Sequence, residues 1–312
     1  MAVYDCCPFF NENDLLELRI NEHWDFVDKF IITEAAETHT GIKKPFNFDH
    51  KRFDKYKSKI IYVKIEDFEK EIKENSSTLL DNYSFHDRSK VGQFTSDWVR
   101  DHLQGNYPIK ILKDLGTADD DIIYLSALDE ILNEQAFVKG LNMFSNKSEL
   151  YLLKSEQKQI LDQNKQPVYT RPSFGFFQDM YVYKFNLFCK KIAVAQMTEF
   201  SLLKKILPAT IRSLSIHTHP NIEEAGWHFT FLDDTDGDRV FSKHKSWAHS
   251  RDHLPGQKVK FTHTTKEESL KRLFLDYEIK KVDITEQTHP KYLIDNLDKY
   301  KNYILHKEID FK

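Results

Sequence analysis

The stretch Asp119-Asp-Asp-Ile-Ile-Tyr-Leu-Ser-Ala-Leu-Asp-Glu-Ile131 decides the predicted fold. Ile122 to Leu125 is a short apolar run of β-favouring residues between polar segments, which is typical of a strand buried on both faces. Ligands of open α/β sheets bind beyond the carboxyl ends of the strands. We therefore expect Ser126, Asp129 and Glu130 to lie at a cleft and not in the core.

The two acids that follow this strand have two interpretations. In the first, Asp129 and Glu130 are solvated loop residues, or they cap a helix that starts near Asn133. In the second, a carboxylate holds a divalent cation against a diphosphate, as Mg²⁺ and Mn²⁺ sites do with one or two carboxylates and substrate oxygens. This stretch by itself leaves both interpretations open.

Length and composition indicate a globular protein. The chain has 312 residues, which is near the upper limit for a single hydrophobic core. Hydrophobic residues make up 40% and charged residues 30%, so disorder is not expected. The formal charge is −4 and basic residues are scattered among acids, which argues against a nucleic-acid partner.

No run approaches the 18 apolar residues of a membrane span, and the amino terminus lacks a signal-like pattern. We therefore expect a soluble, cytoplasmic protein without a membrane span. Cys6, Cys7 and Cys189 lack the spacing of a metal knuckle, and we expect them to be reduced and buried.

Strands alternate with helices along the first half of the chain, and Asn13 or Asp14 is expected to cap the first helix. This alternation predicts an α/β fold with a mostly parallel sheet covered on both faces. The predicted strands are Val3–Cys7, Phe30–Ile32, Ile60–Val63 and Ile122–Leu125, and the predicted helices are Gln93–Gln104 and Ile109–Leu115.

The second half is more mixed. Asp233–Asp238 is rich in turn-forming residues, but it lacks the ligand spacing of an EF-hand, so calcium is not expected. The remaining predicted strands are Leu150–Lys154, Met180–Phe188 and Gly226–Leu232, and the remaining helices are Arg239–His249, Lys266–Leu273 and a surface helix or extension over Tyr292–Lys312.

Several separate motifs follow one another in the order of one known enzyme family. They are Phe10-Asn11-Glu12-x-Asp14-Leu15-Leu16-Glu17-Leu18-Arg19, Val27–Phe30, Glu34 with Thr38-His39-Thr40-Gly41, Asp120–Ile123, Ser126-x-x-Asp129-Glu130-Ile131, and Gly226–Phe229 with Lys243, Ser246 and Ala248-His249. From about residue 3 to residue 250 the chain resembles glycosyltransferase family 17, which includes the animal enzyme that adds the bisecting N-acetylglucosamine to N-glycans. The segment Asn142–Glu223 matches loosely, and acceptor choice is expected there.

The resemblance implies a GT-A-like single domain over residues 1–260, with residues 261–312 as a helical extension packed on it. It also implies an inverting enzyme that moves a sugar from a nucleotide-sugar donor, expected to be UDP-linked, to a glycan hydroxyl and so forms a β-linkage. Mn²⁺ or Mg²⁺ would bind the diphosphate. The donor sugar stays open among N-acetylglucosamine, glucose and xylose.

One position departs from the family pattern Ser-Asp-x-Asp-Glu-Ile. The corresponding residues here begin Ser126-Ala127, so the first acid is missing. Two explanations stay open: an alteration at Ala127 that inactivates the enzyme, or a member that handles its metal with Asp129 alone.

Site roles follow from the resemblance and from side-chain chemistry. Asp129 is the predicted metal ligand, and His228 or His249 is a further candidate, although such a His is as often a hydrogen-bonded core residue. Arg100 and Lys243 are candidates to neutralise phosphate, with solvated helical charges as the alternative. The residues expected at the donor are Asn11, Glu12, Asp14, Thr38, His39, Arg100, Ser126, Ala127, Trp227 and Lys243.

An inverting transfer needs a carboxylate within hydrogen-bond reach of the attacking hydroxyl. Glu130 is the first candidate because it belongs to the matched motif, and Glu34 and Glu224 are the others. A nucleotidyltransferase is an alternative, but no Gly-rich phosphate loop follows the first strand. A non-catalytic protein that binds sugars or nucleotide sugars is the second alternative, because the acid at Ala127 is missing.

Overall fold

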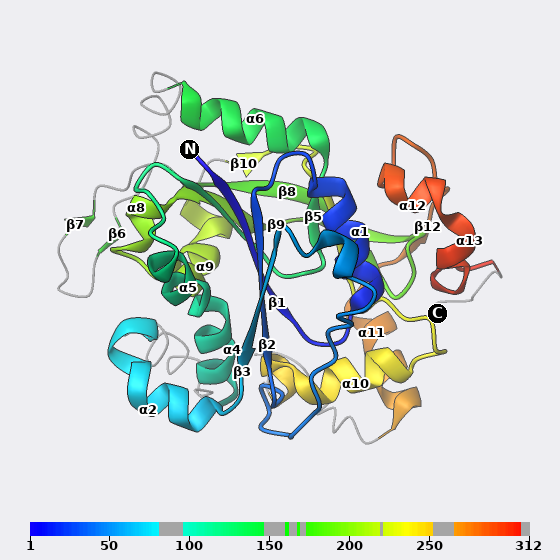
Figure 1. Ribbon diagram of the computed structural model, residues 1–312. Coiled ribbons are helices and arrows are strands. Elements are labelled where there is room, and N and C mark those ends of the chain that lie inside the picture. Colours follow the sequence, from blue (N-terminus) through cyan, green and yellow to red (C-terminus); the bar gives the residue numbers. More distant parts are fainter. Residues whose placement is uncertain are drawn as a thin grey trace.

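A mixed ten-stranded sheet runs through the protein, and helices cover both of its faces (Figure 1). The computed structural model describes residues 1–80, 96–146, 160–161, 167–168, 173–218, 221–251 and 265–306. The strands of the sheet are β1 (Val3–Phe9), β2 (Lys29–Ala35), β3 (Ile60–Ile65), β4 (Ile122–Leu125), β5 (Glu130–Leu132), β8 (Ser173–Val182), β9 (Leu187–Glu199), β10 (Asn221–Ile222), β11 (Gly226–Thr230) and β12 (Lys280–Lys281). Their order is β3-β2-β1-β4-β9-β8-β11-β5, with β10 beside β8 and β12 beside β9.

Short and medium-length helices connect these strands. The α-helices are α1 (Asn13–His23), α2 (Phe68–Leu79), α4 (Ser96–Asn106), α5 (Pro108–Asp114), α6 (Glu134–Ser145), α8 (Phe200–Leu203), α9 (Pro208–Thr218), α10 (Asp238–Ser246), α11 (Lys266–Asp276), α12 (Lys291–Asp295) and α13 (Leu297–Tyr300). Single 3-10 turns are η1 (Asp54–Tyr56), η3 (Ala248–Arg251) and η4 (Lys301–Tyr303), and β6 (Ile160–Leu161) pairs with β7 (Pro167–Val168) in a separate two-stranded sheet. No helix in the described part of the chain combines the length and the apolar character that a membrane crossing requires.

The first half of the sheet is parallel, with β1 between β2 and β4. The side chains of Cys7 and Tyr124 face a core that includes α1, whereas those of Cys6 and Ile123 face α5, α8 and α9. β4 begins at Ile122 and ends at Leu125, and all four of its residues are buried. The structure therefore confirms the predicted strand, both in its bounds and in its burial on both faces.

The sheet becomes mixed after β4, because β4 pairs with β9 in the antiparallel direction and β9 forms a hairpin with β8. The prediction of one strand over Met180–Phe188 is wrong, since the chain turns between Val182 and Leu187. Tyr183 has a φ of 69° in this turn, and both Tyr183 and Phe185 are buried. Buried apolar residues thus continue through the turn, which is why the sequence pattern does not reveal it.

The cap of the first helix differs from the prediction. The residue before α1 is Glu12, and no side chain caps the helix. Asn13 donates its side-chain N–H to the Asn47 carbonyl (2.9 Å), and the Asp14 carboxylate accepts from the Tyr303 hydroxyl (2.6 Å). Neither side chain is therefore available as a cap, because each binds a distant segment.

Two further predictions concern loops. The Asp233–Asp238 stretch is a turn, in which the fully buried Asp233 carboxylate accepts N–H groups at the start of α10. Asn133 caps α6 by accepting the Ala136 N–H (2.8 Å). Leu150–Lys154 lies outside the described residues, as do residues 93–95 of the predicted helix that is observed as α4.

The carboxyl-terminal segment is not a surface helix in its described part. Leu293 and Tyr300 are fully buried in the same core as β1, β4 and β11, and the Tyr300 ring contacts the Phe185 ring at 5.7 Å. The Trp227 indole N–H donates to the Thr288 carbonyl (2.8 Å). A mixed α/β sheet flanked by helices confirms the predicted fold class, GT-A-like.

Glu17 of α1 generates a prediction about pH. Burial by itself would raise the pKa of Glu17, but hydrogen bonds from Lys299, Arg52 and Tyr292 outweigh it and lower the pKa from 4.5 to about 2. A carboxyl group whose pKa is lower in the folded state stabilises the fold above the unfolded pKa and loses that effect as the pH falls towards the folded pKa.

We therefore expect Glu17→Gln to reduce the free energy of unfolding by about 2 kcal/mol at pH 6.5, and the difference from wild type to shrink between pH 4.5 and pH 3. Urea denaturation at several pH values measures it. Glu66→Gln, at an exposed loop position, is the matched control and should show a small difference at every pH. A Glu17→Gln effect that stays constant down to pH 3 would contradict the prediction.

Candidate active site

A cleft of about 550 Å³ lies beyond the carboxyl ends of β1, β2 and β4. Its other walls come from α4, α9, β11 and the segment from the end of α10 to η3. A cleft of this size at this edge of the sheet suits a small ligand. Nine of the residues expected at the site line it, namely Glu12, Thr38, His39, Ala127, Asp129, Glu130, His228, Lys243 and His249.

A fully buried arginine holds the loop between β4 and β5. Arg19 of α1 donates Nη1–H groups to the carbonyls of Ala127 (2.8 Å), Leu128 (3.1 Å) and Glu130 (2.8 Å), and its Nε lies 3.0 Å from a carboxylate oxygen of Asp5. Arg19 also binds the hydroxyl of Ser126. Ser126, which is buried and does not line the cleft, is thus tied to the scaffold and not directed towards a donor.

His23 completes this buried network. Its Nδ1 lies 2.8 Å from the Asp5 carboxylate, and its Nε2 accepts the Leu132 N–H (3.0 Å). Burial tends to raise the pKa of Asp5, but Arg19 and His23 outweigh burial and lower it. The carboxylate therefore stays ionised, and the network fixes the loop at both its start and its end.

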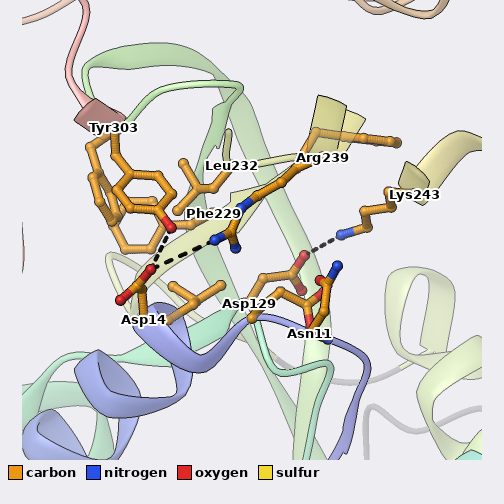
Figure 2. A pocket seen from close by; sticks show the side chains of 12 residues that line it. Asn11, Asp14, Asp129, Phe229, Leu232, Arg239, Lys243 and Tyr303 are labelled. Carbon is orange, nitrogen blue, oxygen red and sulfur yellow. Dashed lines mark hydrogen bonds and ion pairs between the residues drawn. The ribbon is translucent and has the colours of Figure 1, made fainter. Parts of the chain in front are cut away.

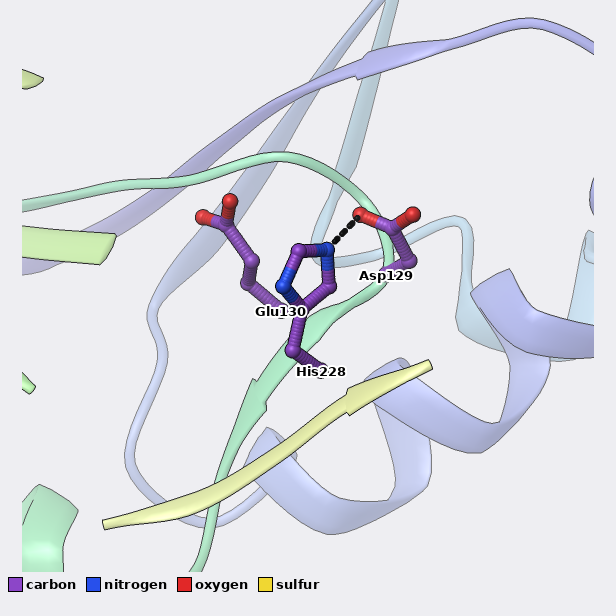
Figure 3. A group of neighbouring side chains, drawn as sticks. All are labelled: Asp129, Glu130 and His228. Atoms are coloured by element: carbon purple, nitrogen blue, oxygen red, sulfur yellow. Dashed lines mark ion pairs between the residues drawn. The ribbon is translucent and has the colours of Figure 1, made fainter. Parts of the chain in front are cut away.

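Asp129 lies between two basic groups on the cleft floor. Its Oδ2 accepts a hydrogen bond from Lys243 Nζ at 2.9 Å, and its Oδ1 lies 3.5 Å from His228 Nε2 (Figures 2 and 3). Burial would raise the pKa of Asp129, but Lys243 and His228 hold it well below its usual range. The pKa of Lys243 is raised, because Asp129 and Glu12 outweigh the effect of burial. Asp129 and Lys243 thus form a stable ion pair.

Glu130 is held by two donors. The Ala127 N–H donates to its Oε2 at 2.9 Å, and Arg212 Nη2 donates to its Oε1 at 2.7 Å. Arg212 comes from α9 and lines the cleft. The sequence motifs do not indicate Arg212, because it stands in the loosely matching segment and no motif surrounds it. The one signal in the sequence is a basic residue on a helix, which by itself does not indicate a site.

One group of side chains could hold a metal ion. Ligand atoms of Asp129, Glu130 and His228 lie within 4.8 Å of one another (Figure 3). Two carboxylates and an imidazole suit Mn²⁺ or Mg²⁺ together with substrate oxygens. In addition, His228 Nδ1 is buried and has no hydrogen-bond partner among the described residues. The donor atoms therefore fit a divalent ion.

His249 does not join this group. It lines the cleft wall, where its ring packs against Trp98 at 4.4 Å and Trp247 at 4.8 Å. His249 therefore lies outside the group of Asp129, Glu130 and His228, which could hold an ion.

A small pocket of about 30 Å³ adjoins the cleft and shares Glu12, Asp129 and Lys243 with it (Figure 2). Asn11 and Asp14 line this pocket and do not line the larger cleft. Its volume suits a water molecule and excludes a nucleotide base. Asn11 and Asp14 therefore approach Asp129 from the side of α1.

The structure places four other expected residues away from the cleft lining. Glu34 is fully buried, and Lys44, Tyr62 and the N–H groups of residues 47 and 48 donate to it, so it anchors the 44–48 segment. Glu224 is exposed before the start of β11. Neither carboxylate has the position that a base for this cleft requires.

Trp227 and Arg100 also have other roles. Trp227 neighbours His228 on β11, so their side chains point to opposite faces of the sheet, and its indole binds the 288 carbonyl. Arg100 donates to the His39 carbonyl (3.2 Å) and packs beside Gly41. Arg100 thus supports the loop after β2, from which Thr38 and His39 reach the cleft.

The fold and this site define an α/β protein with paired acids and basic groups in a cleft at the carboxyl edge of its sheet. Residues 1–151 match the model of Glycosyltransferase family 17, which is 151 of the 312 residues. The resemblance is thereby confirmed over residues 1–151, and the protein is a glycosyltransferase. The motifs between Gly226 and His249 lie outside the matched residues. A comparison with curated proteins finds no significant match.

Arg19 generates a prediction about stability. Arg19→Met leaves Asp5 buried without its main partner, and breaking a buried pair in this way typically costs about 3–5 kcal/mol. We expect a loss of this size in urea denaturation, whereas Asp5→Asn combined with Arg19→Met should recover part of it. Lys57→Met removes an exposed partner of Asp54 and is the control, with an expected change below about 1 kcal/mol. Equal losses in the Arg19 and Lys57 variants would contradict the prediction.

Proposed function

We propose that this glycosyltransferase is an inverting enzyme that moves a sugar from a UDP-linked donor to a glycan hydroxyl and forms a β-linkage, with Mn²⁺ or Mg²⁺ on the diphosphate. The observation that carries the proposal is the group of Asp129, Glu130 and His228 in the cleft beside β4. Lys243 and Arg212 bring two cations to the same place. A diphosphate needs such positive charge when it leaves.

The donor fits the cleft with its diphosphate beside Asp129 and Lys243. Its nucleoside then lies towards the turn after β1, where Glu12 lines the cleft, and towards Thr38 and His39 after β2. These are the carboxyl ends of neighbouring parallel strands, where nucleotides bind in open α/β sheets. Lys44 is a further cation on this wall.

Asp129 and His228 are the residues that would hold the divalent ion. When bound, the ion supplies positive charge that stabilises the leaving diphosphate. The protein's own part is to fix both ligands: His228 lies on β11 opposite Glu130 of β5, and the Phe229 N–H donates to the Asp129 carbonyl (2.8 Å). This pairing holds the two side chains in register.

Glu130 is the proposed base. The acceptor hydroxyl gives its proton to Glu130 as its oxygen attacks the anomeric carbon. The bond from that carbon to the phosphate oxygen breaks, and its electron pair leaves with the nucleoside diphosphate, which Lys243 neutralises. Arg212 holds the Glu130 carboxylate in position through its 2.7 Å hydrogen bond. Attack from the face opposite the leaving group inverts the anomeric centre.

The acceptor is proposed to enter from the wall that carries α9. Val194 of β9 and Ala209, Arg212 and Ser213 of α9 line the cleft on this side. All four belong to Asn142–Glu223, the segment that matches the family motifs loosely. Acceptor choice would then depend on residues of this loosely matching segment.

A thermal-shift panel of nucleotide sugars with and without Mn²⁺ tests the proposal. A ligand at 100 times its dissociation constant stabilises the folded state by about 2.7 kcal/mol. We expect UDP-sugars with Mn²⁺ to raise the melting temperature most, and release of UDP when glycan acceptors are added. Release of pyrophosphate would instead favour a nucleotidyltransferase, and glycan binding without nucleotide binding would favour a non-catalytic protein.

His228 generates a second prediction. His228→Ala removes a proposed metal ligand. Because the His228 side chain is only partly buried, the fold should persist. Transfer should fall at least about tenfold, which corresponds to about 1.4 kcal/mol. His249→Ala alters the same cleft outside the group of proposed ligands. It should change the Mn²⁺ dependence of transfer less than His228→Ala does. Early melting of His228→Ala with unchanged donor binding would show that His228 is a core residue.

Ala127 generates a third prediction. Ala127 lines the cleft beside Asp129, so Ala127→Asp would restore the family's first acid next to the proposed ion. Losses of groups around a metal typically cost about 10–100-fold, and we expect a gain of that size in UDP release with Mn²⁺ and an acceptor mixture. Full activity of the Ala127 form without any gain in Ala127→Asp would show that the site works without a second acid.

A further inference from the structure

The ion pair between Lys243 and Asp129 has a consequence for the order in which ligands bind. We propose that Lys243 occupies the cation position at Asp129 in the empty enzyme, so that the divalent ion binds tightly only together with the nucleotide diphosphate, which draws Lys243 away. The inference rests on the proposed function and deepens it.

Asp129 and Glu130 are each already paired with a basic side chain. Lys243 Nζ lies 2.9 Å from Asp129 Oδ2, and Arg212 Nη2 lies 2.7 Å from Glu130 Oε1. The two carboxylates therefore face two permanent cations. A divalent ion needs carboxylate oxygens that are free to bind it, and here Asp129 and Glu130 are each paired with a cation until an anionic ligand arrives.

Lys243 and the ion would compete for the same carboxylate oxygens of Asp129. Asp129 is almost buried, with 10% of its side chain exposed, and His228 already approaches its other oxygen. An ion that binds Asp129 must come close to the Lys243 ammonium. Like charges at such a distance repel strongly where water is scarce, so the free ion is disfavoured.

Lys243 has a flexible side chain, and a bound diphosphate would offer it a second partner. It reaches Asp129 from the last turn of α10, a different element from the one that carries Asp129, and 27% of its side chain is exposed. Lysine is a flexible side chain with a compact charge that binds phosphate well. A diphosphate beside Asp129 would attract Lys243 and leave the carboxylate to the ion.

Binding of the ion and binding of the diphosphate are then coupled, and by linkage each strengthens the other by the same factor. The coupling has a physical source in one side chain, because Lys243 opposes the ion in the empty site and favours the diphosphate in the filled one. Removing the Lys243 charge should tighten binding of the ion alone and weaken binding of the diphosphate alone, so the coupling between them should fall.

The experiment measures Mn²⁺ binding to the full chain by electron paramagnetic resonance, with and without UDP. For wild type we expect weak binding of Mn²⁺ alone and binding at least tenfold tighter with UDP, corrected for the Mn²⁺–UDP complex in solution. Lys243→Met should bind Mn²⁺ alone at least tenfold more tightly than wild type, and UDP without metal more weakly. Lys243→Arg keeps the charge and should behave like wild type.

Lys245→Met is the matched control, because Lys245 is exposed on the same turn of α10 and does not line the cleft. It removes the same charge and should leave Mn²⁺ affinity unchanged. Circular dichroism checks folding, and Lys243→Gln replaces Lys243→Met if the latter fails to fold.

Two outcomes separate this inference from the proposed function. Unchanged affinity for free Mn²⁺ in both Lys243→Met and Lys243→Gln, with UDP-dependent binding intact in wild type, overturns the role of Lys243 alone. Absence of Mn²⁺ binding in wild type and in every variant, with or without UDP, overturns the metal site and this inference with it.

Discussion

The buried ion pair between Asp5 and Arg19 is the constraint on which the site depends. Asp5 lies on β1 and Arg19 on α1, and both side chains are fully shielded from water. Arg19 uses its remaining N–H groups on the carbonyls of the loop after β4, and His23 accepts an N–H group just beyond that loop. Removing either charge would leave the other unpaired in the core. The first strand, the first helix and the loop that carries Asp129 are therefore held as one unit.

The site is assembled on this unit from elements that are distant in the sequence. Asp129 and Glu130 follow β4, whereas Lys243 comes from α10 and Arg212 from α9. Asp129 and Glu130 each have their own cation, so both carboxylates are held in place in the empty cleft. Once the donor is bound, cations that already lie beside the diphosphate can stabilise the charge that it develops as it leaves. In the proposed mechanism, ligand binding is linked to a change of partner by Lys243, while Arg212 stays on Glu130.

The carboxyl-terminal segment supports the site from the core side of β11. β11 carries His228 towards the cleft, while its neighbours Trp227 and Phe229 face the core. The Thr288 carbonyl accepts the indole N–H, and Tyr300 packs in the same core. Because the side chains of a strand alternate between faces, anchoring of the core-facing side chains fixes the direction of the imidazole between them. Residues far from the cleft thus determine the geometry of one proposed ligand.

The sequence by itself determined the strand Ile122–Leu125, the α/β class and the placing of Asp129 and Glu130 at a cleft, because burial and polarity along a short segment report local surroundings. Only the tertiary structure decided which charged groups meet. Arg212 and Glu130, which form a hydrogen bond, are 82 positions apart in the sequence. Arg19 and Ser126, whose hydroxyl Arg19 binds, are 107 positions apart. The sequence pattern assigned donor or base roles to a set of residues that the fold uses for support, namely Glu34, Arg100, Ser126 and Trp227. A motif records which side chains recur, but whether a carboxylate or an indole points into a cleft depends on hydrogen-bond partners that the folded chain brings from elsewhere.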